Sequence, residues 1–305
     1  MRFLVTGGAG FIGSHVTNDL LSRGHNVVVL DNFSTGKLEN LGPGCEIIEA
    51  DITDPIRDRD FDAVFHLAAF VSAPDSIRDP DECFRVNVDG SKNVLDLGLP
   101  TVLASSAAVY GNKEGIAEEC SALNPVSPYG ESKLEMEEIA RGSSGRVSLR
   151  FFNIYGPRQS ASSKYSAVVP AFVTAMRKGA PYYIHGTGEQ IRDFVYVEDL
   201  VEHIWQACSA LIGNERKPIP SSLNVCSGIP TRIIDIARNI GEALRIESGE
   251  EGAPGDVVYA PERIGDIRTS LGSRLQWETF IGNTSNRTTA EGLRDLIKNM
   301  ENGNA

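Results

Sequence analysis

Tyr129 and Lys133 are the residues whose types and spacing point most directly to chemistry. Four residues apart on a helix, they share one face, so the Lys133 ammonium can lie beside the Tyr129 phenol. A free tyrosine has a pKa near 10, so a phenolate base at neutral pH needs about 4 kcal/mol of stabilisation from its surroundings. Ser106 follows a predicted strand over 100–104 and could bind the same substrate oxygen and relay its proton. A Tyr-x-x-x-Lys pair alone is common on solvated helix faces, so this interpretation depends on its context.

That context begins with a glycine-rich segment near the N-terminus, which predicts a pyrophosphate-binding loop. An apolar strand precedes the loop, and an apolar helical pattern begins at Phe11 and Ile12. Gly7 can adopt positive φ, Gly10 lets the backbone approach a phosphate, and Gly13 lets the helix pack close to the strand. The helix N-terminus then directs N–H groups and a partial positive charge at the anion.

Asp31 indicates which dinucleotide this loop binds. It ends a second hydrophobic run over 26–30, lies 18 residues past Gly13, and is followed by Asn32 in a polar loop. An acid at this place accepts the ribose hydroxyls of an adenosine and repels a 2′-phosphate, so the sequence predicts NAD rather than NADP. The alternative is a nucleotide-binding type of fold that holds no nucleotide.

The elements that must position these residues alternate along the chain. Further strands are predicted over 45–49, 61–65 and 146–153, with a long helix over 79–99 that carries Asn87. Alternation of this kind predicts right-handed βαβ units and a Rossmann-type, doubly wound parallel sheet with helices on both faces. Ligands bind at the carboxyl ends of such strands, which here carry Asp51, Ile52, His66, Leu67, Ala68, Ala69, Ser105 and Ser106. His66 by itself is more typical of a hydrogen-bonded structural histidine than of a catalytic one.

Beyond Gly156 the alternation loosens. A helix over 168–176, a strand over 182–184, a loop over 186–193, a helix over about 198–211, a strand over 223–226 and a short helix over 290–300 are predicted in turn. Since no linker separates two halves, we expect a smaller C-terminal α/β domain interleaved with the first. The predicted division gives 1–155 and about 191–228 to the NAD-binding domain, and about 156–190 and 229–305 to a substrate domain.

Composition limits the possible partners and setting. The 305 residues carry a net charge of −12, which argues against nucleic acid or an anionic membrane as a partner. No apolar run approaches the length of a membrane span, and a strand begins directly after Met1, so we expect neither an anchor nor a signal peptide. Five scattered cysteines predict no disulfide framework and no metal site and favour a cytoplasmic protein: Cys45, Cys83, Cys120, Cys208 and Cys226.

Taken together, the motifs resemble the extended short-chain dehydrogenase/reductase family, and within it the NAD-dependent nucleotide-sugar 4-epimerases. The resemblance runs from residue 1 to about 272. It is carried by Thr6-Gly-Gly-Ala-Gly-Phe-Ile-Gly-Ser14, Ser105-Ser106 before Val-Tyr-Gly111, Tyr129-Gly-Glu-Ser-Lys133, Arg150-Phe-Phe-Asn-Ile-Tyr-Gly-Pro157, Arg192-Asp-Phe-Val-Tyr-Val-Glu-Asp-Leu200 and Arg263-Ile-Gly-Asp266.

The resemblance implies roles for individual residues. Ser106, Tyr129 and Lys133 are the implied catalytic residues. The implied cofactor contacts are Gly7, Gly10, Phe11, Ile12, Gly13, Asp31, Asn32, Asp51, Ile52, Leu67, Ala68, Ala69, Asn87, Ser105, Tyr129, Lys133 and Phe152. Phe151 is also implied to lie by the nicotinamide. The implied UDP-sugar contacts are Ser72, Ser106, Asn153, Val168, His185, Arg192, Arg263, Asp266 and Ser270, with Asn153, Arg192 and Arg263 at the diphosphate and Asp266 at the uridine ribose.

The residues after Ser106 separate the reactions known in similar proteins. Sugar dehydratases of this kind need an Asp-Glu pair there, and the related decarboxylases use a glutamate. This chain has Ala107-Ala108, which cannot transfer a proton. The resemblance therefore implies reversible oxidation at C4, in which Tyr129 takes the O4 proton, hydride passes to NAD, and hydride returns to the other face of the 4-keto sugar.

The preferred sugar depends on smaller differences. Similar UDP-galactose epimerases carry a lysine at the position of Val71 and an Asn-Leu pair at Ala167-Val168, while Ser270 stands where bulkier residues exclude 2-acetamido sugars. The sequence thus favours UDP-GlcNAc/UDP-GalNAc interconversion with UDP-Glc/UDP-Gal also accepted, although a roomier pocket discriminates weakly. A strict glucose/galactose enzyme is the alternative.

The sequence leaves two alternative functions open, and the resemblance also implies a protein partner. A UDP-glucuronate 4-epimerase would need a seat for the C6 carboxylate, which the sequence does not single out. A non-catalytic NAD-binding regulatory protein on the same fold is a rival from another class. The resemblance also implies a homodimer, formed through the helix after Asp79 and the Tyr129 helix.

Overall fold

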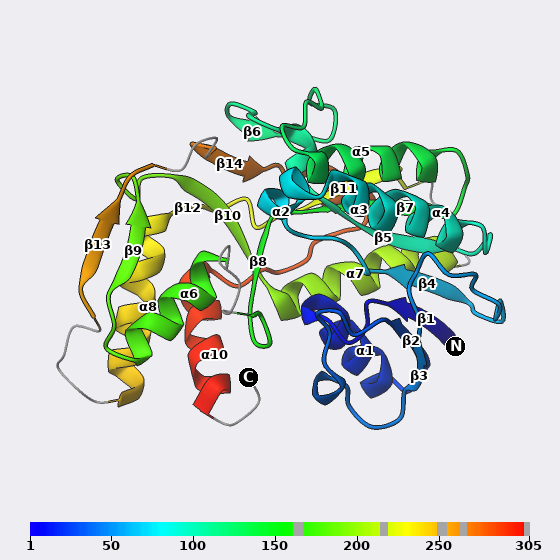
Figure 1. Cartoon of the computed structure of the whole chain (residues 1–305), viewed down its shortest axis with the longest axis horizontal. Coiled ribbons are helices and arrows are strands. Elements are labelled where there is room, and N and C mark those ends of the chain that lie inside the picture. Colours follow the sequence, from blue (N-terminus) through cyan, green and yellow to red (C-terminus); the bar gives the residue numbers. More distant parts are fainter. Residues whose placement is uncertain (161–166, 214–218, 249–254, 263–266, 302–305) are drawn as a thin grey trace.

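A seven-stranded parallel sheet forms the centre of the chain (Figure 1). The computed structural model describes residues 1–160, 167–213, 219–248, 255–262 and 267–301. Across the sheet the strands follow the order β11-β7-β5-β4-β1-β2-β3. They are β1 (Arg2–Thr6), β2 (Asn26–Asp31), β3 (Glu46–Glu49), β4 (Ala63–His66), β5 (Thr101–Ser106), β7 (Arg146–Phe151) and β11 (Ser222–Val225). The order changes direction between β1 and β4, where ligands bind in doubly wound sheets. The predicted Rossmann architecture is confirmed.

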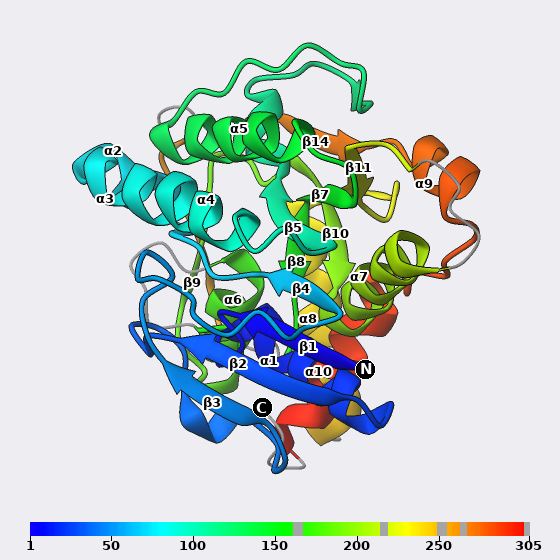
Figure 2. The same cartoon turned by 90° about the vertical axis from the view of Figure 1, so that its right-hand side faces the viewer.

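Helices cover both faces of this sheet (Figure 2). On one face lie α1 (Phe11–Ser22) and α7 (Val197–Ile212), and on the other lie α3 (Pro80–Phe84), α4 (Gly90–Leu95) and α5 (Pro128–Arg141). Alternate residues of β1 therefore enter different cores: Phe3 and Val5 pack with α1 and α7, whereas Leu4 packs with Val94 of α4. Both faces are buried, which is why the central strands are continuous hydrophobic runs. Shorter helical segments are η1 (Leu38–Asn40), α2 (Ala73–Arg78) and η3 (Ala107–Tyr110).

A second lobe lies beside the sheet, at the left of Figure 1. One sheet runs in the order β12-β10-β14-β6, with β8 paired to β10. A parallel pair, β9 and β13, lies next to helices α6 and α8, and α10 packs against α8. The elements are β6 (Ile116–Ala117), β8 (Asn153–Tyr155), α6 (Val168–Arg177), β9 (Tyr182–His185), β10 (Ile191–Tyr196), β12 (Pro230–Arg232), α8 (Ile233–Ser248), β13 (Val257–Ala260), β14 (Thr269–Gly272) and α10 (Thr289–Glu301). Helix α9 (Leu275–Phe280) packs instead against β11 of the large sheet, where its Trp277 joins the core. In the described part of the chain no helix is long and apolar enough to cross a membrane.

The loop predicted over 186–193 is wrong at its end, because β10 begins at Ile191. The polar residues at its start interrupt the hydrophobic pattern from which strands are predicted. Arg192 pairs with Thr231 and Ser270 on neighbouring strands, and the fully buried Asp193 accepts hydrogen bonds from Ser227 Oγ at 2.7 Å and from three backbone N–H groups. The sheet thus supplies partners that a polar segment needs in order to be buried.

The single long helix predicted over 79–99 is also wrong. The segment is α3, then a π-helical turn η2 (Arg85–Asp89), then α4, which ends at Leu95. Asn87 lies in the π-helical turn, and its amide binds both the N–H and the C=O of Phe70, at 2.8 and 3.1 Å. It also donates to Ser132 Oγ at 2.9 Å. A π-helical turn of this kind is frequent at functional sites.

The C-terminal helix α10, predicted over 290–300, is present and is fixed to the rest of the chain. Arg287, just before it, forms ion pairs with Glu198 at 2.9 Å and Asp295 at 2.9 Å, and a further one with Asp199. Gly292 lies so close to Tyr155 that a Cβ there would be 2.1 Å from the phenol oxygen. These contacts fix α10 to α7 and to β8.

Candidate active site

The glycine-rich loop has the geometry that its sequence predicts. Gly7 has φ +68°, and a Cβ on it would lie 2.6 Å from the backbone nitrogen of Ala68 at the end of β4. A Cβ on Gly13 would lie 2.0 Å from the Gly7 carbonyl oxygen. Gly10 directly precedes α1, whose first turn contains Phe11 and Ile12. The loop therefore brings the N-terminus of α1 against the end of β4, where Leu67, Ala68 and Ala69 follow.

Acidic and amide side chains flank this loop at the ends of β2 and β3. Asp31 accepts hydrogen bonds from the N–H groups of Ala9 at 2.9 Å and Phe33 at 2.8 Å, which fixes its carboxylate beside the loop. Asn32 donates to Asp51 at 3.1 Å. Partial burial opposes the ionisation of Asp51, but hydrogen bonds from Thr53, Asn32 and Arg85 outweigh it and lower its pKa to about 2.

These groups fit a dinucleotide. A pyrophosphate requires backbone N–H groups at the start of α1 and glycines at positions where any side chain would collide. An adenosine ribose requires a fixed carboxylate, which Asp31 provides. Ile52, predicted as a cofactor contact, is buried in the core, where a Cβ on Gly90 of α4 would lie 2.6 Å from its side chain.

Tyr129, Lys133 and Ser106 come together between α5 and the end of β5. The Tyr129 side chain lies beside Ser106, whose Oγ accepts from the N–H of Ala108 at 3.1 Å. Lys133 donates from Nζ to the carbonyl of Ala104 at 2.8 Å. Burial lowers the pKa of Lys133 to about 8. Burial also raises the pKa of Tyr129, an effect that the neighbouring Ser106 hydroxyl only partly opposes. The fold thus brings Ser106, Tyr129 and Lys133 together, but it does not by itself lower the pKa of the Tyr129 phenol.

A cavity of about 210 Å³ opens beside Ser106. Its walls include six residues predicted to line the site or lie beside the nicotinamide: Ser106, Phe151, Phe152, Asn153, Arg192 and Ser270. Ala107 and Ala108 also line it. Lys113 lines it as well and was missed by sequence reasoning, because it lies in a loop after Gly111 that carries no motif. Its ammonium donates to the neighbouring Glu114 carbonyl at 2.6 Å.

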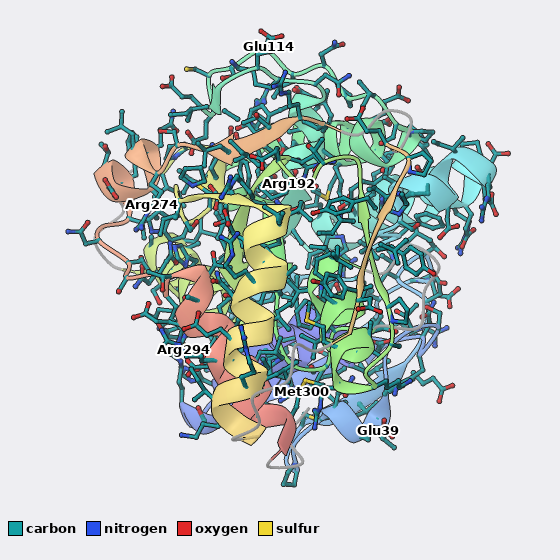
Figure 3. The ribbon with its side chains drawn as sticks, turned by 90° about the vertical axis from the view of Figure 1, so that its left-hand side faces the viewer. Glu39, Glu114, Arg192, Arg274, Arg294 and Met300 are labelled. Carbon is teal, nitrogen blue, oxygen red and sulfur yellow. The ribbon has the colours of Figure 1, made fainter. Side chains whose placement is uncertain are left out.

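A second cavity of about 310 Å³ lies further into the second lobe. Val168 of α6 and His185 of β9 line it, as predicted for substrate contacts, and Asn153 and Arg192 line both cavities. Figure 3 shows Arg192 near the middle of the molecule, whereas Glu114 and Glu39 lie at its edges. The two cavities therefore share one wall, on which Arg192 provides a cation.

Of the predicted UDP-sugar contacts, Ser72 lines neither cavity. Ser72 caps the N-terminus of α2, where its Oγ binds Asp75. Arg263 and Asp266 lie outside the described residues. Ser105 faces the interior, where its hydroxyl donates to Glu137.

His66 has the structural surroundings expected for it. It is buried, with Nδ1 at 2.8 Å from Thr6 Oγ1 and Nε2 at 2.9 Å from Ser91 Oγ. Burial, together with the charge of Lys133, lowers the pKa of His66 to about 3. The neutral His66 ring therefore connects β1, β4 and α4 through hydrogen bonds at both of its nitrogens.

Several known proteins are similar to this chain over nearly its whole length. Residues 3–225 match the NAD dependent epimerase/dehydratase family. A putative UDP-glucose 4-epimerase from Methanocaldococcus jannaschii is 32% identical over 324 residues, covering 99% of each protein. The structure of a UDP-N-acetylglucosamine 4-epimerase from Methanobrevibacter ruminantium, in complex with UDP-N-acetylmuramic acid, has a TM-score of 0.88 at 31% identity, over 99% of this chain and 98% of that one. A Thermus thermophilus UDP-glucose 4-epimerase complex with NAD has a TM-score of 0.84 at 33% identity, over 99% of both chains.

Proteins with other activities are similar too. UDP-glucuronic acid decarboxylase 1 from Arabidopsis thaliana is 31% identical, over 99% of this chain and 70% of that protein. An NAD-dependent NDP-hexosamine 5,6-dehydratase has a TM-score of 0.83 at 28% identity, over 99% of this chain and 98% of that one. Overall similarity leaves the reaction open, so it must be argued from the residues of the site.

Proposed function

The chain belongs to the NAD-dependent epimerase/dehydratase family, and from this premise we propose that it inverts C4 of UDP-hexoses through a 4-keto intermediate. It is an enzyme that acts on UDP-sugars, and its cofactor is NAD. One observation carries the choice of reaction: the residues that line the cavity after Ser106 are Ala107 and Ala108, which cannot move a proton. Ser106 lines this cavity and Tyr129 lies beside Ser106, so we assign the proton transfer at the sugar to these two residues.

In the proposed reaction Tyr129 accepts the proton of the C4 hydroxyl, while Ser106 binds the same oxygen and the phenol. Because burial raises the pKa of Tyr129, the phenol needs a nearby positive charge to act as a base at neutral pH. When bound, NAD supplies a positively charged ring and a hydride acceptor for C4. We propose that Lys133, whose Nζ donates to the Ala104 carbonyl, binds the cofactor ribose and adds positive charge beside the phenol.

The cavity lining argues against elimination and decarboxylation. Similar dehydratases need an Asp-Glu pair after the position of Ser106, and similar decarboxylases need a glutamate. Among the described residues that line the cavity beside Ser106 there is no aspartate or glutamate. Inversion at C4 instead requires that the keto sugar present its second face, for which small side chains at Ala107, Ala108 and Ser270 leave room.

The same small side chains support a choice of sugar. Ser270 lies on β14 and lines the cavity, where it leaves space for a 2-acetamido group. We therefore propose that UDP-GlcNAc and UDP-GalNAc are interconverted together with UDP-Glc and UDP-Gal. Arg192, on the wall shared by the two cavities, is proposed to bind the diphosphate, with Val168 and His185 towards the uridine.

UDP-glucuronate is the second candidate substrate, because the structure offers a seat for its carboxylate. Lys113 lines the cavity beside Ser106 and Ser270, so its ammonium could turn from the Glu114 carbonyl to an anionic group on the sugar. An ammonium placed against a carboxylate favours an acidic sugar over a neutral one of the same size.

NMR of the anomeric signals tests both candidates. The purified protein, loaded with NAD, is incubated separately with UDP-GlcNAc, UDP-Glc and UDP-glucuronate. Conversion of UDP-GlcNAc at a rate comparable to that of UDP-Glc supports the main proposal. Conversion of UDP-glucuronate alone favours the second candidate. A protein that converts none of them, and whose bound NAD is not reduced by any of them, would be a binding protein on this fold.

Three further parts of the proposal concern setting and assembly. We propose that the protein works in the cytoplasm and forms a homodimer through α3, α4 and α5. We also retain the division into an NAD-binding domain (1–155 and about 191–228) and a UDP-sugar domain (about 156–190 and 229–305). Light scattering of the NAD-loaded protein tests the dimer, and a monomeric mass would contradict it.

A further inference from the structure

We propose that Glu137 is a positioning residue for the reaction, one that couples the helix of Tyr129 and Lys133 to the strand of Ser106. The proposal rests on the function proposed above. Glu137 lies on α5, one helical turn after Lys133, and its side chain is only 1% exposed. It touches neither cavity, so it acts through other residues.

Glu137 binds the two strands on which α5 packs. On β7, Arg150, also 1% exposed, donates to it from Nη2 at 2.7 Å and from Nε at 3.0 Å. On β5, Ser105 donates to it from Oγ. Lys133 donates to Ala104, the residue before Ser105, at 2.8 Å. Helix α5 is thus fixed to two consecutive residues of β5, and the next residue is Ser106.

The network continues from Arg150 towards the cavity wall. Arg150 also donates to the Tyr110 phenol at 2.9 Å, and Tyr110 donates to Asn224 of β11 at 2.7 Å. Asn224 in turn donates to the carbonyl of Ala117, which lines the cavity. Each side chain in this hydrogen-bonded series has a partner, so the buried charges of Glu137 and Arg150 are compensated.

A buried ion pair is a weak source of stability, because well-packed apolar residues would serve the fold as well. Its value here is geometric. A carboxylate with three fixed donors allows one position of α5 along β5, whereas an apolar contact would allow sliding. Small displacements of reacting groups reduce rates strongly, by roughly 100-fold for 1 Å.

Glu137 also acts on the charge of Lys133. Burial lowers the pKa of Lys133, and the Glu137 carboxylate and the Cys83 thiol of α3 oppose this shift. Other elements packed around α5 also bring polar groups near it. The ionisable ones are His66 of β4, which stays neutral, and Arg150 of β7 and Tyr110 of η3, which lie near Glu137. The uncharged ones are Ser76 of α2, Asn87 of η2 and Ser105 of β5. Removing the carboxylate therefore makes Lys133 lose its proton at lower pH.

Glu137→Gln is the test, with Glu138→Gln as the matched control. Glu138 is the next residue, is half-exposed and pairs only with Arg141 among the described residues, so the same isosteric change there should leave kcat unchanged. For Glu137→Gln we expect kcat on the converted UDP-sugar to fall by at least about tenfold. The alkaline limb of its pH profile should also move to lower pH, with UDP affinity within about twofold of the parent protein.

A readout independent of turnover separates this proposal from the proposed function. The 13C signal of the Lys133 side chain is followed by NMR against pH. In Glu137→Gln it should titrate at lower pH than in the parent protein, and in Glu138→Gln its titration should be unchanged. If the parent protein converts no UDP-sugar but this shift appears, the proposed function fails and the coupling stands. Unchanged titration and unchanged kcat in folded Glu137→Gln would overturn the coupling.

Ser105→Ala covers the case in which Glu137→Gln does not fold. It removes the link to β5 and leaves the ion pair with Arg150 in place. We expect a lower kcat with the Lys133 titration unchanged, because the carboxylate charge remains. Full activity in Ser105→Ala would show that the link to β5 does not position the reacting groups, and would overturn the geometric part of the proposal.

Discussion

Replacing Tyr129 by phenylalanine removes one oxygen from the proposed site and little else. That oxygen is the proposed proton acceptor, so its loss should lower kcat by roughly 100- to 10,000-fold, the range for a lost general base. This corresponds to about 3–5 kcal/mol of transition-state stabilisation. The fold should lose much less. The interaction with the Ser106 hydroxyl is lost, but Ser106 still accepts from Ala108 N–H, so we expect a cost in unfolding free energy below about 1 kcal/mol.

Three measurements separate these effects. NMR of the anomeric signals gives kcat, calorimetric titration with UDP gives nucleotide affinity, and urea unfolding gives stability. We expect a large loss in the first and almost none in the other two. Near-normal turnover in Tyr129→Phe would refute the assignment of the base. Equal losses in UDP affinity and turnover would instead indicate a damaged pocket.

Three other changes test separate parts of the molecule. Ser270→Tyr should suppress turnover of the acetamido sugars selectively, and equal loss on UDP-Glc would contradict the role given to this cavity wall. Gly292→Ala should destabilise the protein by about 1–3 kcal/mol, because its Cβ would lie 2.1 Å from the Tyr155 oxygen. Adding Tyr155→Phe should recover part of this in a thermal-unfolding cycle, whereas simple additivity would argue against the contact. Burial lowers the pKa of His203 from 6.5 to about 4, so its neutral ring stabilises the fold above pH 6.5, and about 2 kcal/mol is lost between pH 7 and pH 5. Urea unfolding of His203→Gln should show a weaker pH dependence, and an unchanged slope would contradict this.

Local patterns carried most of what the sequence predicted. The glycine spacing, Asp31 after its strand and the Tyr129–Lys133 pair each depend on residues close in the chain, and the structure has the geometry that they require. The strand β10 was missed because its first residues are polar, and their burial depends on partners from Ser227 and Gly272 far along the chain.

The remaining features depend on contacts that no local pattern records. Lys113 reaches the cavity only because its loop folds back beside β14, on a different part of the chain. Glu137 and Arg150 are ordinary surface residues by type, and only the packing of α5 on β7 makes them a buried pair. The π-helical turn at Asn87 likewise follows from the Phe70 backbone that the amide binds.

The placement of β14 has a consequence for how the protein is made. β14 (Thr269–Gly272) inserts between β10 and β6, which lie about 75 and 150 residues earlier in the chain. A ribosome releases the glycine loop, Tyr129 and the last strand of the large sheet, β11, well before this piece. A nascent chain can therefore complete its nucleotide cradle while the sugar cavity still lacks Ser270. The newly made protein is thus able to hold its cofactor before it is able to hold its substrate.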